Sequence, residues 1–235
     1  RISAKIAVFF FMIYLQNVCK IYGTGQICVQ ALKGISLHVK EGECVVLKGA
    51  SGSGKSTILS LMAGLSKPTT GDIIVNGKAV SKLLDHFSAE FRRKNIGFIF
   101  QKFHLLPNLS VRENIIIPLI PENLTPEEIS KRFEAVMDGL GLDAKISVPT
   151  RLLSGGEQQR VAIARAMINN PHIIIADEPT ANLDATLSQA FIHAMSRLKK
   201  EGKTIVIATH DPLFFDLDYV DRIIEIKNGE ILQWR

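Results

Sequence analysis

Long apolar segments and clustered charge are both missing from this 235-residue sequence, and each absence excludes a class of protein. The apolar run 6–15 has ten residues, whereas a helix that crosses a bilayer needs about 20. No small-x-small cleavage site follows it, so we expect neither a membrane channel nor a cleaved signal peptide. The 28 basic residues exceed the 23 acidic ones by only five and are scattered along the chain. A nucleic-acid partner, which needs a clustered basic face, is therefore not expected.

Cysteine is also scarce, and its spacing is uninformative. Cys19, Cys28 and Cys44 form no CxxC pair and have no histidine cluster nearby, so we expect small buried apolar residues in a reducing compartment. Repeats, low-complexity stretches and linkers are absent as well. We therefore predict one compact domain over 12–235, with 1–11 as an N-terminal extension of uncertain role.

Strand-like and helix-like patterns alternate along this domain. Strands are predicted at 13–18, 35–39, 44–47, 73–75, 96–100, 173–176 and 204–208, with tight hairpins at Asn76-Gly77 and Asn228-Gly229. Thr125 and Glu128 predict a capping box at the start of an amphipathic helix that continues to Leu140. The alternation predicts an α/β fold with a mainly parallel sheet, an N-terminal antiparallel β part and an inserted helical lobe at about 102–165.

A glycine-rich loop follows the unbroken apolar strand 44–47 and precedes a helical stripe of Ile58, Leu61, Met62 and Leu65. Strand, glycine-rich loop and helix form the context that a phosphate-binding loop requires, so the fold is of the P-loop NTPase, RecA-like type. Inward-facing amides and the helix N-terminus bind phosphates there. The predicted nucleotide-binding residues are Gly49, Ala50, Ser51, Gly52, Ser53, Gly54, Lys55, Ser56 and Thr57. Lys55 would reach the β- and γ-phosphates, and the Ser56 hydroxyl would hold Mg²⁺.

Two acids end the buried strand 173–176. Asp177 is predicted to orient Mg²⁺, mostly through water, because this ion keeps much of its hydration shell. Glu178 is predicted to act as the general base on the attacking water.

The segment Leu153-Ser-Gly-Gly-Glu-Gln-Gln-Arg160 contains a second helix start. Ser154 and Glu157 predict a capping box, but a cap alone does not explain Gly155 and Gly156 in the first turn. Each glycine costs a helix about 1 kcal/mol, whereas bare backbone at a helix N-terminus suits an incoming phosphate. All four residues are therefore predicted to bind nucleotide.

This octapeptide resembles the signature of ABC ATPases, and the order of motifs resembles that family over essentially all of 12–235. The resemblance implies that Gln101 contacts Mg²⁺ and the water and senses a membrane subunit. It further implies that His210 contacts the γ-phosphate and that Tyr22 stacks on adenine. Ala181 to Asp184 would form the D-loop, with Asp184 among the nucleotide-binding residues. Glu157 departs from the commonest signature, which carries glutamine. Because this position caps the helix, we expect the exchange to be tolerated.

The stretches 64–71 and 98–114 resemble the lipoprotein-release and macrolide-efflux branch of ABC ATPases. Membership implies ATP hydrolysis by a head-to-tail pair of copies, at the cytoplasmic face of the inner membrane, beside separate permease subunits. Amino-acid importers share much of 101–107, so an importer remains an alternative. A soluble ABC ATPase acting on DNA or the ribosome is less expected, since the chain has one phosphate loop, one signature and no long coiled-coil insertion.

Overall fold

The computed structural model describes residues 11–23, 27–181 and 183–234. The predicted extension therefore falls almost wholly outside the described residues. The strands are β1 (Ile13–Tyr22), β2 (Val29–Val39), β3 (Cys44–Lys48), β4 (Thr70–Val75), β5 (Ile96–Ile99), β6 (Ile173–Asp177), β7 (Thr204–Thr209), β8 (Arg222–Lys227) and β9 (Glu230–Trp234). The α-helices are α2 (Lys55–Met62), α3 (Asp85–Asn95), α4 (Val111–Ile116), α5 (Pro126–Met137), α6 (Gly155–Met167) and α7 (Ala185–Lys200).

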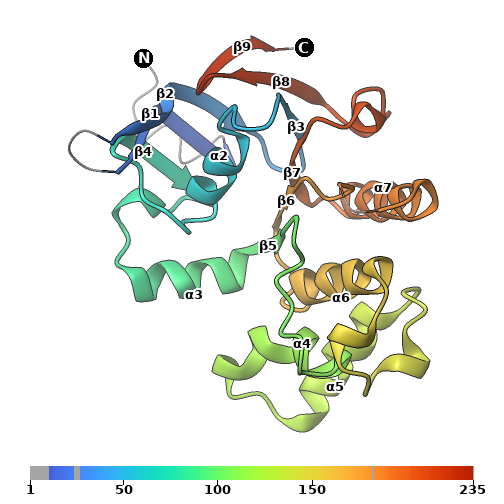
Figure 1. Ribbon diagram of the computed structural model, residues 1–235. Helices are drawn as coiled ribbons and strands as arrows, with labels where there is room; N and C mark the ends of the chain where they lie inside the picture. Colours follow the sequence, from blue (N-terminus) through green and yellow to red (C-terminus); the bar gives the residue numbers. More distant parts are fainter. Residues whose placement is uncertain (1–10, 24–26, 182, 235) are drawn as a thin grey trace.

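The strands form two sheets (Figure 1). A six-stranded sheet has the order β5-β6-β7-β3-β8-β9, parallel throughout except for the final β8–β9 hairpin. A three-stranded antiparallel sheet has the order β2-β1-β4. The predicted fold class, a mainly parallel sheet with an antiparallel β part, is confirmed.

Alternating side chains bury both faces of the large sheet. Val45 and Leu47 of β3 join the core beneath the small sheet and α2, whereas Cys44 and Val46 join the core beneath α7. The same alternation continues on β6 and β7. A strand covered on both faces has no polar face, which explains the unbroken apolar runs in the sequence.

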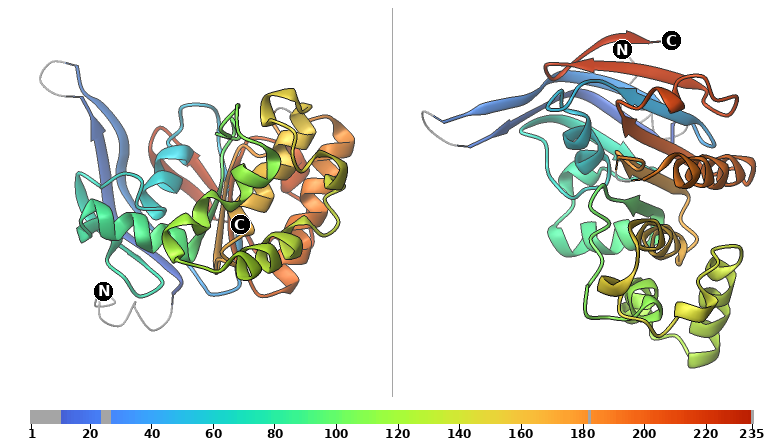
Figure 2. Two further views of the ribbon diagram at one scale, coloured as in Figure 1. Left: turned by 90° about the horizontal axis from the view of Figure 1, so that it is seen from below. Right: turned by 45° about the vertical axis from the view of Figure 1, so that its right-hand side comes forward.

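The helical lobe has its own core and lies below the sheets in Figure 1. Figure 2 shows from two further directions that α6 lies between the large sheet and the pair α4 and α5. Short 3₁₀ turns connect the lobe helices: η2 (Ile117–Glu122), η3 (Asp143–Lys145) and η4 (Thr150–Leu152). Two further turns, η1 (Val80–Lys82) and η5 (Pro212–Phe214), lie outside the lobe. The predicted capping box of Thr125 and Glu128 is present at the start of α5.

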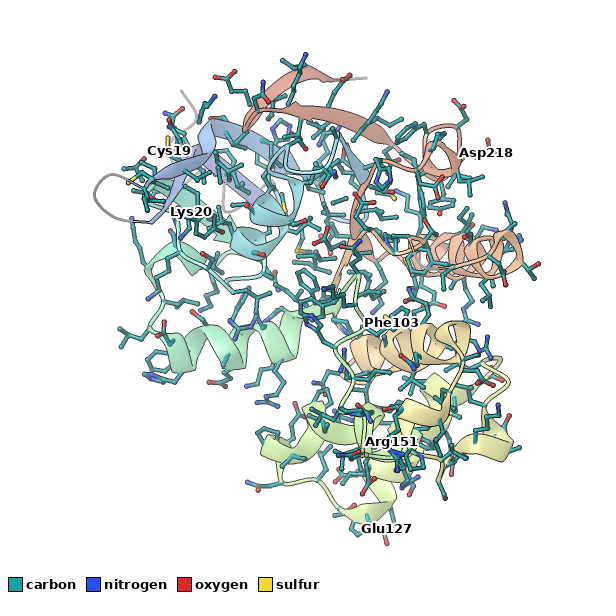
Figure 3. The ribbon with its side chains drawn as sticks, in the orientation of Figure 1. Cys19, Lys20, Phe103, Glu127, Arg151 and Asp218 are labelled. Carbon is teal, nitrogen blue, oxygen red and sulfur yellow. The ribbon has the colours of Figure 1, made fainter. Side chains whose placement is uncertain are left out.

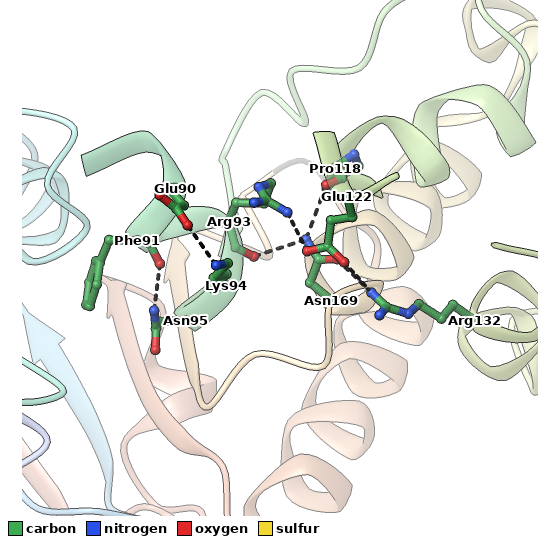
Figure 4. A network of polar contacts seen from close by, with 9 residues as sticks. All are labelled: Glu90, Phe91, Arg93, Lys94, Asn95, Pro118, Glu122, Arg132 and Asn169. Atoms are coloured by element: carbon green, nitrogen blue, oxygen red, sulfur yellow. Dashed lines mark hydrogen bonds and ion pairs between the residues drawn. The ribbon is translucent and has the colours of Figure 1, made fainter. Parts of the chain in front are cut away.

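Helix α3 was missed by the sequence analysis because its sequence is mostly polar. Its last turn is bound to the lobe by a polar network (Figure 4). Arg93 pairs with Glu122, which also accepts a hydrogen bond from Arg132 at 2.9 Å. Asn169 donates to the Arg93 carbonyl at 3.0 Å. These polar contacts connect α3 to the lobe, while Phe91 of the same helix packs against the hydrophobic core.

Several predicted boundaries were wrong: β2 begins at Val29 and not at 35, β4 begins at Thr70 and not at 73, and two helices end earlier than predicted. Helix α2 ends at Met62 because Gly64, with φ 61°, forms a Schellman-type cap. In this cap the Leu65 N–H donates to the Ser60 carbonyl at 2.9 Å. Leu65 therefore lies beyond the helix and is exposed. Helix α5 ends at Met137, before Leu140, because Gly139 has φ 72°.

Strand β1 continues beyond the predicted end of 13–18 because its pairing resumes past an irregularity near Asn17 (φ 48°). The turn at Asn76-Gly77 exists, with φ 43° and 70°, but the chain after it forms η1 instead of a second strand. The hairpin at Asn228-Gly229 is present as predicted.

Candidate active site

Four strand ends bring the predicted site residues to one edge of the large sheet. Lys48 of β3 pairs with Thr209 of β7, and Asp177 of β6 pairs with Ala208 of β7. The phosphate loop, Asp177 and His210 therefore leave neighbouring strands at their carboxyl ends. Beyond β6, the end of β5 leads to Gln101. Ligands of open parallel sheets bind in this position, outside the carboxyl ends of the strands.

The phosphate loop contains backbone that only glycine suits. Gly52 and Gly54 have φ 76° and 109°, and a Cβ on Gly49 would lie 2.3 Å from the Ile226 carbonyl oxygen. The helix that follows, α2, has no side-chain cap and no acid in its first turn. Helices α4, α5, α6 and α7 each begin with a side-chain cap. The first amides of α2 are therefore left for an anion.

Side chains in the loop also fit a polyanion. The Ser53 hydroxyl is buried and, among the described residues, has no hydrogen-bond partner. Lys55 is 4% exposed, and its ammonium donates to the carbonyls of Gly49 at 2.6 Å and Ala50 at 3.1 Å. An orphaned hydroxyl and a buried cation in an anion-binding loop match the groups that a triphosphate requires.

A hydroxyl and a carboxylate meet beside this loop. Ser56 Oγ donates to Asp177 Oδ1 at 3.0 Å, which joins α2 to the end of β6. Burial raises the pKa of Asp177, and the neighbouring Glu178 charge raises it further, while the Ser56 hydrogen bond opposes the shift. Two hard oxygen ligands at this spacing fit Mg²⁺. A cation here would relieve the cost of burying the carboxylate.

Glu178 contacts two other predicted site residues. Its Oε1 lies 3.2 Å from the Lys55 ammonium, and its Oε2 lies 3.0 Å from His210 Nδ1. The side chain is 12% exposed, and the residue adopts φ 44°, a left-handed conformation that costs a non-glycine residue about 1–2 kcal/mol. Its N–H donates to the Ala208 carbonyl at 2.8 Å, which fixes this conformation. Local backbone strain of this kind clusters at functional sites.

The signature segment begins α6 and meets the residue after Glu178, because Gln159 Nε2 donates to the Pro179 carbonyl at 3.1 Å. Ser154 caps α6, and Glu157 completes the predicted capping box. Ser154 and Gly155 are exposed, whereas Gly156 is buried, and a Cβ there would lie 2.3 Å from Leu187 Cδ1 on α7. Gly156 thus also serves close packing between two helices, a role that the sequence analysis did not foresee.

Two predicted nucleotide contacts have other partners here. Tyr22 is 44% exposed at the end of β1, with the Lys20 ammonium 4.9 Å from its ring centroid. Asp184 caps α7 by accepting from the Leu187 N–H at 2.8 Å. Of the predicted D-loop, Asn182 lies outside the described residues. The nucleotide roles of Tyr22 and Asp184 stay predictions.

A family model described as ABC transporter matches residues 32–181 of the sequence. The chain belongs to the ABC transporter family. It is 42% identical over 222 residues to an uncharacterized ABC transporter ATP-binding protein of Methanocaldococcus jannaschii, covering 94% of this chain and 98% of that protein. It is also 42% identical to the macrolide export ATP-binding/permease protein MacB of Marinobacter nauticus, over 94% of this chain but only 34% of that longer protein.

Solved structures agree with this assignment. Two dimeric structures of the ABC transporter cassette MJ0796, one of them in a post-hydrolysis state bound to ADP and Pi, align with a TM-score of 0.88. They are 40% and 41% identical to this chain and cover 95% of it and 98% of each cassette. The chain is therefore an ABC-type ATPase whose relatives include the macrolide-export branch. No helix in the described part of this ABC ATPase is both long and apolar enough to span a membrane.

Arg165 of this ABC ATPase fixes the segment that carries Gln101, and the motif spacing in the sequence did not predict this contact. Phe103 and His104 both adopt left-handed backbone, with φ 57° and 48°. Their carbonyls accept hydrogen bonds from the two terminal nitrogens of Arg165 on α6, each at 2.6 Å. Figure 3 places Phe103 where β5 meets α6. A bidentate guanidinium thus holds a strained turn two residues beyond Gln101.

We expect Arg165→Lys to lower kcat about tenfold while leaving ATP affinity nearly unchanged. Lysine keeps the charge but cannot donate to both carbonyls in one plane, so Gln101 would be displaced, and small displacements of positioning groups cost up to about 100-fold. Arg151→Lys, at an exposed arginine of the lobe, is the matched control. Steady-state kinetics with separate ATP titrations check the result. Equal kcat values for Arg165→Lys and the parent would contradict this role.

Proposed function

We propose that this chain binds MgATP at its phosphate loop, hydrolyses it in a head-to-tail pair of copies, and drives separate membrane subunits in export. The observation that carries the proposal is the arrangement of Lys55, Glu178 and His210 beside an uncapped helix N-terminus. A buried cation, a carboxylate and an imidazole at an anion-binding helix end supply charge stabilisation and a base for phosphoryl transfer to water.

Lys55, Glu178 and His210 would each have a role in ATP binding and hydrolysis. In the structure, Lys55 is held by loop carbonyls and by Glu178. Binding of a triphosphate would draw the ammonium onto the β- and γ-phosphates, which frees one oxygen of Glu178. That carboxylate would then accept the proton of the attacking water, while His210 turns toward the γ-phosphate.

Ser56 and Asp177 are the residues we assign to Mg²⁺, with Gln101 reaching the same ion. When bound, Mg²⁺ offsets the negative charge on the phosphate oxygens. The hydrogen bond between Ser56 and Asp177 already brings their oxygen ligands together, and the cost of burying the Asp177 carboxylate supports a cation at that position. Asp177 would act largely through water.

A second copy of the chain would supply further contacts to the γ-phosphate. Ser154 and Gly155 are exposed at the start of α6, so the Ser154 hydroxyl and the Gly155 amide could contact a γ-phosphate held by another protomer. The dimeric state of the MJ0796 cassettes supports this arrangement. Because the γ-phosphate would join both copies, ATP favours the closed pair and its hydrolysis favours opening.

A groove beside the Gln101 segment is our candidate surface for a membrane subunit. It encloses about 350 Å³ between α3, β5 and α6, and its lining includes Leu65, Arg92, Phe98, Phe100, His104 and Arg165. Phe98, Phe100 and His104 stack in series, with successive ring centroids 4.2 Å and 4.6 Å apart. An apolar floor with a basic rim suits a short amphipathic helix, and such a helix would contact the residues that hold Gln101.

Export is the direction we propose because the MacB relatives are macrolide export proteins. The match covers only 34% of those longer proteins, and the separate permease is part of the proposal. The chain would then lie peripherally at the cytoplasmic face of the inner membrane. Pull-down of the tagged chain from solubilised membranes, with the co-purified permease identified, separates exporter from importer.

The ATPase itself is tested on the purified chain. We expect MgATP hydrolysis whose rate per chain rises with protein concentration, because each site needs residues from two copies. Dilution series at saturating MgATP measure this dependence. A specific activity that stays constant over the whole dilution range, together with a strictly monomeric sedimentation profile, would contradict the paired mechanism.

A further inference from the structure

The signature of this chain carries a negative charge at Glu157, where the commonest signature has glutamine. Glu157 folds back onto the first turn of α6, where its Oε2 accepts the Ser154 N–H at 2.9 Å. The Ser154 and Gly155 groups that we assign to a partner's γ-phosphate lie at the same helix end. A carboxylate there would repel a phosphate that binds the same helix end, because charges closer than the screening length of about 8 Å interact. Something must offset this repulsion if the helix end is to accept an anion.

Lys145 is placed to do so. Its ammonium lies 2.5 Å from Glu157 Oε1, the oxygen that the Ser154 amide leaves free. The lysine ends η3, where its N–H bonds to the Leu142 carbonyl at 2.8 Å and its carbonyl accepts from Val148 at 2.9 Å. The backbone that carries the ammonium is therefore fixed, and the side chain points from the lobe to the signature.

The pair differs from an ordinary surface ion pair. Glu157 is only 15% exposed, whereas Lys145 is 45% exposed. The Lys145 hydrogen bond, followed by the Ser154 amide, lowers the pKa of Glu157 to about 2, so the carboxylate is ionised at every pH at which the site would work. Even an unshifted glutamate, with a pKa of about 4.3, is ionised near neutral pH, so a nearby cation is what can offset this charge.

We propose that Lys145 is a positioning residue that neutralises Glu157 and thereby lets the signature of one copy accept the γ-phosphate held by a second copy. This inference rests on the proposed function, because it needs the paired mechanism. A glutamine at position 157 would keep the cap without the charge and would make Lys145 dispensable. The lysine is therefore required by the departure of this sequence from the commonest signature.

The test measures ATP-driven dimerisation in a Glu178→Gln background, in which the pair should be trapped. Sedimentation with MgATP gives the dimer dissociation constant. We expect Lys145→Met to weaken the dimer about tenfold, less at high salt, because screening weakens the repulsion of phosphate by the unpaired carboxylate. Glu157→Gln should dimerise at least as tightly as the parent, and adding it to Lys145→Met should restore the parental constant within about twofold. Lys145→Arg should remain near the parent.

Lys131→Met is the charge-matched control, since Lys131 is exposed on α5. It should leave the dimer constant unchanged, and melting temperatures should show that all variants fold. A purely structural ion pair predicts the opposite pattern: both single variants lose stability and the double variant is no better than either. That pattern, or a Lys145→Met variant that dimerises normally or fails to fold even with Glu157→Gln, overturns the inference. If the Glu178→Gln parent itself stays monomeric, the proposed function fails first.

Discussion

Glu178→Gln should lower the rate of ATP hydrolysis by about 10²–10⁴-fold while ATP binding remains intact. Glutamine has nearly the shape of glutamate but cannot accept the proton of the attacking water. Because the γ-phosphate would then persist, the contacts that close the pair would persist too. We therefore expect a stable dimer with MgATP, which sedimentation would detect beside a steady-state hydrolysis assay.

The position of Glu178 makes this variant informative. Its carboxylate pairs with the buried Lys55 and accepts hydrogen bonds from His210, so truncation to alanine would leave Lys55 without its anionic partner. The amide oxygen of glutamine can still accept from Lys55, and its –NH₂ can donate to His210 Nδ1 when the imidazole proton is on Nε2, which keeps the fold. Glu134→Gln, at an exposed position of α5, is the matched control. Hydrolysis by Glu178→Gln at the parental rate would show that another group is the base.

Sequence alone predicted those parts of the site whose residues lie close together in the chain. The phosphate loop, the capping box at Ser154 and the acids after β6 are local patterns, because one strand end or one helix start determines them. The alternation of apolar residues on β3, β6 and β7 predicted strands with two buried faces. The order of the strands cannot follow from such patterns, since it depends on which edges pair.

Contacts across long sequence separations were the ones missed. Arg165 binds carbonyls about 60 residues earlier, and no spacing rule connects them. Lys145 meets Glu157 across an irregular turn that carries no periodic signal. Gly156 was interpreted only as a phosphate contact because its neighbour Leu187 lies on another helix. Helix α3 was missed because its sequence is mostly polar: ion pairs bind it to the lobe, and Phe91 packs on the core without an apolar stripe beside it.

Asp177→Asn should move stability and activity in opposite directions. In the free protein, burial and the Glu178 charge raise the pKa of Asp177, so ionisation of this carboxylate opposes folding. Asparagine removes the charge and still accepts from the Ser56 hydroxyl. We expect the melting temperature of the nucleotide-free variant to rise, by about 2–4 °C for each 1 kcal/mol gained. Hydrolysis should fall about 10–100-fold, because the ligand that orients Mg²⁺ is weakened.

The sign of the pH dependence follows from the raised pKa. The folded protein binds the Asp177 proton more tightly than the unfolded chain does, so this residue contributes no penalty below its unfolded pKa of about 3.9. As pH rises from there through the folded pKa, the parent loses stability that the variant retains. The melting temperatures of the two proteins should therefore converge at low pH and separate toward neutral pH.

MgATP should reverse this order, because a bound cation stabilises only the parental carboxylate. Asp218→Asn, at an exposed aspartate, controls for the loss of one negative charge. Parallel melting curves of the two nucleotide-free proteins across this pH range would mean that Asp177 carries no buried charge in the resting protein. Asp177 would thus destabilise the nucleotide-free protein and contribute only when nucleotide is bound. We therefore interpret it as a residue that serves metal binding and not folding stability.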